Sequence, residues 1–159
     1  MEIACRRPSD AQSLPEESDP SAPATSAAAV CPPLYAPLAL DSSQGNNRLL
    51  TILPGTEPHI SCSLAVANLH GPESYDALSY VWGLPSPTDV IAVNGVTVSV
   101  GCSLSSSLRC LRLPDRPRCI WADAICINQQ DDAEKSWQVA MMADIYRYAE
   151  NVRVFVGDE

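Results

Sequence analysis

The feature that most constrains the fold is a change of pattern near Ser103. Before it, the chain shows short β-strand patterns over residues 48–53, 60–69 and 75–82. After it, helical periodicity over 103–113 and 131–150 alternates with apolar runs at 119–122 and 152–156. Helices that alternate with buried strands are typical of a parallel sheet. The sequence therefore predicts an α/β fold, in which amino-terminal β-strands precede an α-β-α-β unit with a partly parallel sheet.

A β-hairpin is predicted around Asn94-Gly95. Runs rich in Val and Ile flank this dipeptide at 90–93 and 96–100. Asn-Gly supplies the two residues with positive φ that a two-residue type I′ turn requires. Further on, Ser103 is a suitable N-cap for the first helix, and Asp131 for the second. We therefore expect the hairpin to be followed by two capped helices.

The first 33 residues have a different composition from the rest. They contain six prolines among Ser, Ala and acidic residues, with scarcely any large apolar side chain. Such a segment cannot bury enough surface to offset the entropy lost on ordering. We expect a disordered tail over residues 1–33 and one folded domain over residues 34–159.

Charge and cysteine content exclude several classes of protein. The net charge is −9, and residues 48–159 still carry 13 acidic against eight basic side chains. Nucleic-acid binding is therefore not expected. The seven cysteines form no Cys-x-x-Cys pair and the chain has two histidines, so neither a disulfide framework nor a metal site is predicted. With no signal peptide or membrane span in the sequence, we expect a cytoplasmic protein.

Three segments in register carry a family resemblance. They are Tyr-Asp-Ala-Leu-Ser-Tyr-Val-Trp-Gly at 75–83, Trp-Ala-Asp-Ala-Ile-Cys-Ile-Asn-Gln at 121–129, and the helix that begins Asp-x-x-Glu at 131–134. Together they resemble the amino-terminal half of the fungal heterokaryon incompatibility (HET) domain. The chain departs from the family pattern at Ser103, where Asn is usual, and at Ala122, where Ile is usual. It also stops at Glu159, so it resembles a domain truncated after its first half.

The resemblance implies a fold and a function. HET domains are thought to have a fold similar to TIR domains, some of which cleave NAD with a glutamate. This implies a role in vegetative incompatibility, with non-self recognition and programmed cell death in a filamentous fungus. Protein partners or self-association are also expected. Two mechanisms stay open: an NAD glycohydrolase-like enzyme with NAD as its substrate, or a non-enzymatic self-associating module. An inactive remnant is a further alternative, and no cofactor is firmly predicted.

The candidate catalytic residues are two carboxylates. Asp123 follows an apolar strand, at the end where parallel sheets place ligand sites. Glu134 lies in the first turn of the next helix, where it could stabilise positive charge during glycosidic cleavage. Each has a structural alternative: Asp123 could bond its own loop, and Glu134 could complete a capping box with Asp131.

The candidate substrate-binding residues surround these carboxylates. Asn128 and Gln129 lie in the expected loop 124–130 and carry amides that can bond a ribose or a base. Trp82 ends a strand and could line a pocket, although a core position is the alternative. Gln138 lies one helical turn after Glu134 and could face the same cleft. Cys126 is interpreted as a buried thiol rather than a nucleophile.

Overall fold

The computed structural model describes residues 34–84 and 88–157, and the tail predicted over residues 1–33 lies outside them. In chain order the elements are η1 Ala36–Leu38, η2 Ser42–Gln44, β1 Asn46–Ile52, β2 Ser61–Asn68, β3 Asp76–Tyr80, β4 Thr88–Val93, β5 Val96–Gly101, α1 Cys102–Leu111, β6 Arg118–Trp121, α2 Asp123–Cys126, α3 Asp132–Tyr148 and β7 Asn151–Phe155. The predicted order of strands, hairpin and α-β-α-β unit is confirmed.

One mixed sheet of seven strands, in the order β5-β4-β2-β1-β6-β3-β7, organises these elements. The parallel part predicted from the second half is confirmed, because β3 pairs in parallel with both β6 and β7. The rest is mostly antiparallel: β1 pairs with β2 and β6, and β4 with β5. The sheet therefore places β1, from the start of the domain, at its centre.

The hairpin between β4 and β5 has the predicted turn. Asn94 and Gly95 have φ values of 50° and 76°, the pair of positive values that a type I′ turn needs. The Asn94 side chain also holds the turn to β2, since its Oδ1 accepts from the Leu64 N–H and its Nδ2 donates to the Leu64 carbonyl, both at 2.9 Å. This contact fixes the hairpin beside the central sheet.

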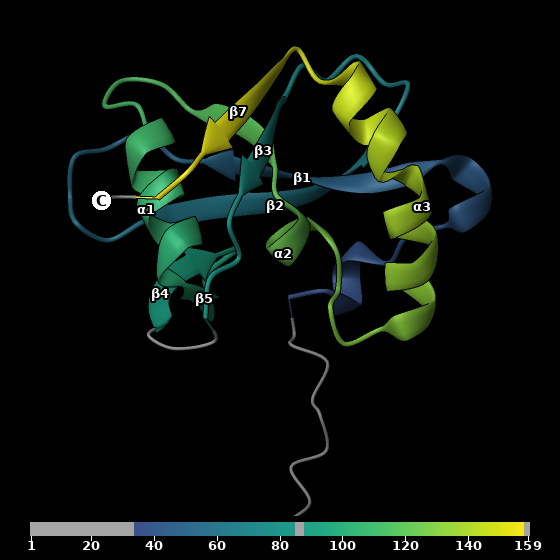
Figure 1. Cartoon of the computed structure of the whole chain (residues 1–159), viewed down its shortest axis with the longest axis horizontal. Helices are drawn as coiled ribbons and strands as arrows, with labels where there is room; N and C mark the ends of the chain where they lie inside the picture. Colours follow the sequence, from purple (N-terminus) through teal and green to yellow (C-terminus); the bar gives the residue numbers. More distant parts are fainter. Residues whose placement is uncertain (1–33, 85–87, 158–159) are drawn as a thin grey trace, which may run out of the picture.

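The helices lie against the sheet as Figure 1 shows, with α1 and α3 apart and the short α2 between them. α1 packs against β3, β4 and β5, and α2 packs against β1. α3 is tied to β1 and β3, because Gln138 Nε2 donates to the Asn46 carbonyl at 2.8 Å and the Tyr146 hydroxyl donates to the Leu78 carbonyl at 2.9 Å. The core between these layers includes Leu50, Ile91, Leu108, Ile120, Trp121 and Ile145.

Two local predictions are wrong. Ser103 does not cap α1: the helix begins at Cys102, and its N-cap, Gly101, has no side chain to donate to or accept from the helix. Residues 124–130 were expected to form a loop, and the structure instead places residues 124–126 in α2. A four-residue helix is too short to show periodicity, so the pattern of the sequence could not reveal it. Within the described ranges, no helix has the length and apolar character of a membrane span.

Candidate functional site

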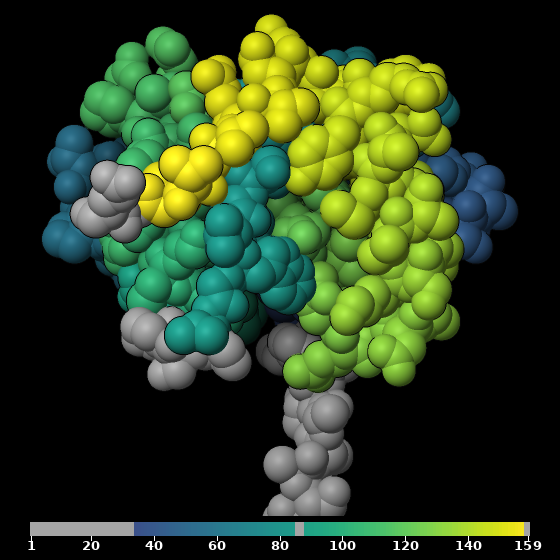
Figure 2. Space-filling view, viewed as in Figure 1, coloured from purple at the N-terminus to yellow at the C-terminus, as the bar shows by residue number. Residues whose placement is uncertain are grey.

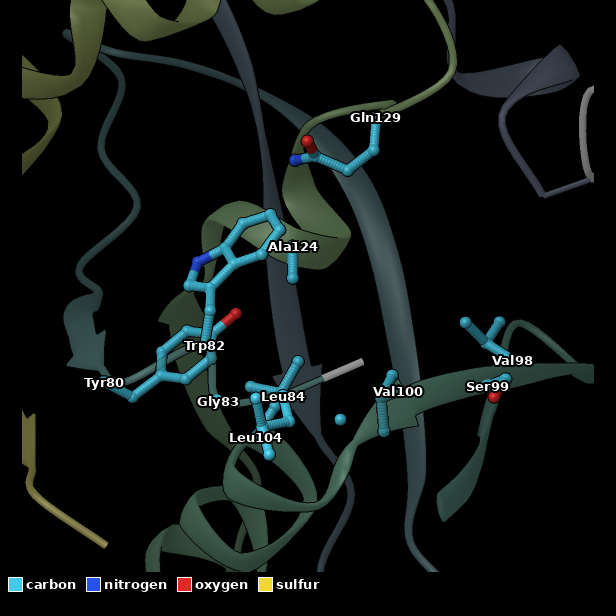
Figure 3. A pocket seen from close by; sticks show the side chains of 11 residues that line it. Tyr80, Trp82, Gly83, Leu84, Val98, Ser99, Val100, Leu104, Ala124 and Gln129 are labelled. Atoms are coloured by element: carbon cyan, nitrogen blue, oxygen red, sulfur yellow. The ribbon is translucent and has the colours of Figure 1, made fainter. Parts of the chain in front are cut away.

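The candidate site lies where β3, β5 and α2 meet. A pocket of about 390 Å³ opens there between the end of β3 and the outer strand of the hairpin. Figure 3 shows Tyr80 and Trp82 on one side and Val98 to Val100 on the other, with Ala124 and Gln129 along the α2 side. A second pocket of about 270 Å³ adjoins it, since both are lined by Val98, Ser99, Ala124 and Gln129. The two pockets form one groove between the hairpin and the 124–130 segment.

Asp123 lines neither pocket, but it contacts Trp82, which lines the first. One carboxylate oxygen accepts from Trp82 Nε1 at 2.9 Å and the other accepts from the Ala124 N–H at 2.8 Å. Trp82 is 53% exposed, so it lines the pocket and is not a core residue. Gln129 Nε2 donates to the Asp123 carbonyl at 2.9 Å. The structure therefore brings three of the predicted site residues together: Asp123, Trp82 and Gln129.

Tyr80 adds a phenol to the same wall. Its burial raises its pKa, and the neighbouring Asp123 carboxylate raises it further. The phenol therefore stays protonated at neutral pH and can donate a hydrogen bond but not act as a base. No basic side chain is among the described residues that line the first pocket. The first pocket therefore suits a neutral planar group of a ligand better than a phosphate.

Glu134 is placed elsewhere, in a buried ion pair. Its Oε1 accepts a hydrogen bond from Arg48 Nη1 at 2.5 Å, and its Oε2 accepts one from Arg48 Nη2 at 2.9 Å. Oε1 also accepts from the Asn128 N–H at 2.8 Å. Arg48 is 1% exposed and Glu134 is 8% exposed. The capping box is half confirmed: Asp131 Oδ1 accepts from the Glu134 N–H, but the Asp131 N–H donates to the Asn128 carbonyl and not to Glu134.

Arg48 is the residue that sequence reasoning missed. Besides Glu134, it donates to the carbonyls of Leu38 at 2.9 Å and Cys126 at 3.0 Å, and its guanidinium lies 4.8 Å from the centre of the Tyr35 ring. The Tyr35 hydroxyl donates to the Ile125 carbonyl at 2.7 Å. The available signal was a charged residue at the start of the predicted strand 48–53. Arg48 and Tyr35 together anchor the segment that forms the α2 side of the groove.

The remaining predicted residues have different positions. Asn128 is 5% exposed and lines the second pocket. Gln138 lies on the same face of α3 as Glu134, but it is fully buried against β1 rather than in the groove. Cys126 is buried as predicted, and burial raises the pKa of its thiol to about 12. In the described part of the chain, no three His, Cys, Asp or Glu side chains converge as metal ligands would.

Comparison with known proteins decides the family. Residues 75–159 match the family described as Heterokaryon incompatibility protein (HET). The chain belongs to this family. It is also similar to heterokaryon incompatibility protein 6, OR allele, of Neurospora crassa, with 38% identity over 138 residues. That alignment covers 77% of this chain and 20% of the Neurospora protein. No solved structure matches this chain.

Proposed function

We propose that this HET-family chain acts in fungal vegetative incompatibility, in the cytoplasm, where it couples non-self recognition to programmed cell death. The observation that carries this proposal is the family match, together with the identity to a Neurospora incompatibility protein. The groove beside Asp123 supports a mechanism in which binding of a small ligand controls the signal. We place the binding contacts on Trp82, Gln129 and Asn128, which line the two adjoining pockets.

The domain in this proposal begins at about Leu34, before the matched segment. Leu34 and Tyr35 are buried and line the second pocket. Arg48, also outside the matched segment, anchors the α2 side of the groove. A domain over residues 34–159 is therefore the unit to which we assign the function.

NAD cleavage is the second candidate function, and the position of Asp123 favours it. This carboxylate follows a strand that pairs in parallel with β3, beside a pocket with an aromatic wall. In a proposed TIR-like arrangement, Asp123 would stabilise the positive charge that develops as the nicotinamide–ribose bond breaks. Glu134, proposed from the sequence for the same role, has its carboxylate bound to Arg48. Asp123 is thus the carboxylate to test first, and Gln138 has a packing role.

To test whether the groove controls cell death, the chain and its variants are expressed in a filamentous fungus and cell death is compared between them. Trp82→Ala removes the aromatic wall of the groove and should abolish cell death. Val81→Ala is the matched control, because Val81 is 60% exposed and precedes Trp82 without lining the pocket. Cell death that persists in Trp82→Ala would show that the groove does not control the signal.

A second assay distinguishes an NAD-cleaving enzyme from a non-enzymatic signalling module. Purified chain is incubated with NAD and nicotinamide release is measured, with Asp123→Asn as the variant. Asn has nearly the same size but carries no charge, and its single amide oxygen can accept only one of the two hydrogen bonds that Trp82 and Ala124 donate to Asp123. The enzymatic candidate predicts a loss of about 100-fold or more, the size expected for an electrostatic catalytic group. If the unsubstituted chain releases no nicotinamide while cells still die, NAD cleavage is excluded and signalling remains.

A further inference from the structure

The groove between the hairpin and the 124–130 segment has no acidic or basic side chain among the described residues that line it. Its two pockets, of about 390 and 270 Å³, are lined by apolar, aromatic, hydroxyl and amide side chains. Another hollow differs in this respect: one of about 330 Å³ beside α3 has Arg48, Asp131 and Glu134 in its lining. The chain has 19 acidic and 10 basic residues, so the uncharged lining of the groove restricts the kind of ligand that can bind there.

This lining disfavours ligands of either charge. A charged group that leaves water needs a counter-charge or several hydrogen bonds at its new position, and otherwise the transfer is costly. The two oxygens of Asp123 accept from Trp82 Nε1 and from the Ala124 N–H, so this carboxylate orients the indole rather than offering a counter-charge to a cation. The net charge of −9 further opposes an anion. An uncharged ligand avoids both costs.

The two pockets differ in polarity, and this difference indicates the shape of the ligand. The segment that follows β3 reaches the surface (Figure 2, teal), where Trp82 is 53% exposed. Its ring lies in the mostly apolar wall of the first pocket and is available for stacking. The second pocket adds Thr97 and Gln130 to the Ser99 and Gln129 that both pockets share. Hydroxyl and amide groups both donate and accept hydrogen bonds, so they suit a hydroxylated group such as a sugar.

We infer that the groove binds an uncharged, nucleoside-like molecule, with its aromatic ring against Trp82 and its hydroxylated group in the second pocket. Together the two pockets lie within the range of small-molecule sites, roughly 300–1,000 Å³. This inference rests on the proposal that a ligand in the groove controls the signal, and it narrows the chemistry of that ligand. A dinucleotide such as NAD meets the condition only if its diphosphate stays outside the groove.

The test measures the binding of matched probes to the purified chain by calorimetry. The common ribonucleosides are compared first. The one that binds most tightly is then compared with its 5′-monophosphate and with its 5′-amino-5′-deoxy analogue, which is protonated at neutral pH. The three probes share a base and a ribose and differ in charge at one position. The uncharged nucleoside should bind at least about tenfold more tightly than either charged analogue, because neither charge finds a partner in the groove.

A charge placed in the groove should reverse this preference. Ser99 is an exposed strand residue that lines both pockets, so Ser99→Lys adds an ammonium group to their shared wall without disturbing the core. The affinity for the monophosphate, relative to that for the nucleoside, should rise at least about tenfold. Val139→Lys is the control: Val139 is 50% exposed on α3 and lines neither pocket, so the same change in net charge should leave the ratio unaltered. Circular dichroism checks that both variants are folded.

Three results would overturn the inference. The first is that no ribonucleoside binds the unsubstituted chain at millimolar concentration. The second is that the monophosphate or the amine binds as tightly as the nucleoside, or more tightly. The third is that Ser99→Lys and Val139→Lys change the ratio equally. All of these measurements are made without cells, so they are independent of the cell-death assay. If the nucleoside binds as expected while Trp82→Ala cells still die, the proposed function fails and the inference about the ligand stands.

Discussion

At the scale of the residue, the position of Glu134 decides how the site is interpreted. Its carboxylate accepts from two guanidinium nitrogens and one backbone N–H, and it is 8% exposed. Little of its accepting capacity is left for a ribose or an attacking water. Removing it would leave Arg48, which is 1% exposed, buried without its counter-charge. Loss of activity in a Glu134 variant would therefore not identify a catalytic residue.

We predict that Glu134→Leu and Arg48→Met each lower the free energy of unfolding by about 3–5 kcal/mol, because each leaves a buried charge unpaired. The double variant Arg48→Met with Glu134→Leu should lose much less than the sum, since neither charge is then left. Urea denaturation measures all three. Asp144→Ala is the control: its ion pair with Arg147 is exposed, so its removal should cost about 0–1 kcal/mol. Additive losses in the double variant would contradict the pairing.

The sequence could predict only the local half of this arrangement. Asp131 as the cap of α3 follows from residues three positions apart, and the structure confirms it. The partner of Glu134 lies 86 positions away, on a strand that only the fold brings near. Asp123 was correctly placed after a strand that is parallel to β3, but its bond to Trp82 spans 41 positions. Contacts between residues so far apart in the sequence can be predicted only if the order of strands in the sheet is known. The residue pattern within β1 or β3 does not reveal that order.

At the scale of the element, Asp76 holds the edge strand in place. Its two carboxylate oxygens accept from Asn151 Nδ2 at 2.8 Å and Arg153 Nε at 2.9 Å, which join β3 to β7. Burial alone would raise the pKa of this carboxyl, but the hydrogen bonds from Asn151 and Arg153 and the charge of Arg153 lower it overall. The ionised form is therefore favoured in the folded protein.

This shift predicts how stability depends on pH. A carboxyl whose pKa is lowered by folding stabilises the protein at pH values above its unfolded pKa of ~3.9. That contribution is lost as the pH falls through the pKa of the folded state. We expect the wild-type chain to lose more stability between about pH 5 and pH 3 than Asp76→Asn, which cannot titrate. Urea denaturation at several pH values measures the difference. Parallel curves for the two proteins would show that Asp76 does not contribute.

Elements with a strong local signal were predictable, and those defined by distant partners were not. The Asn94-Gly95 turn was found because its φ values are set by the two residues themselves. The start of α1 was missed because Gly101 leaves its first turn without a side-chain cap, so no capping residue marks the boundary. The antiparallel pairing of β6 with β1 was also missing from the prediction, which treated the second half as a parallel unit.

At the scale of the whole molecule, the HET match covers less than the folded unit. The matched segment begins at residue 75 and contains β3 to β7, whereas β1 and β2 precede it. β1 lies between β2 and β6 in the sheet, and its Leu50 and Ile52 are buried in the core. Without β1 and β2, the β4–β5 hairpin would lose its connection to the rest of the sheet.

We therefore predict that a chain of residues 75–159 does not fold, while a chain of residues 34–159 folds as the full chain does. Removing β1 exposes the inner edge of β6 and leaves Glu134 without Arg48, so both the sheet and the ion pair are lost. Circular dichroism with thermal melting compares the three chains. A cooperative melt from the shorter fragment would show that the matched segment is an autonomous domain.

The distance along the chain between Arg48 and Glu134 also affects how the protein is made. A ribosome releases β1 and β2 first, and their antiparallel pair can form at once because they are neighbours in sequence. The second edge of β1 must wait for β6, and the Arg48 guanidinium must wait for α3. From the release of β1 until β6 emerges, the future centre of the sheet is therefore an open strand edge. A nascent chain of this protein should need a chaperone most strongly before α3 emerges, and much less afterwards.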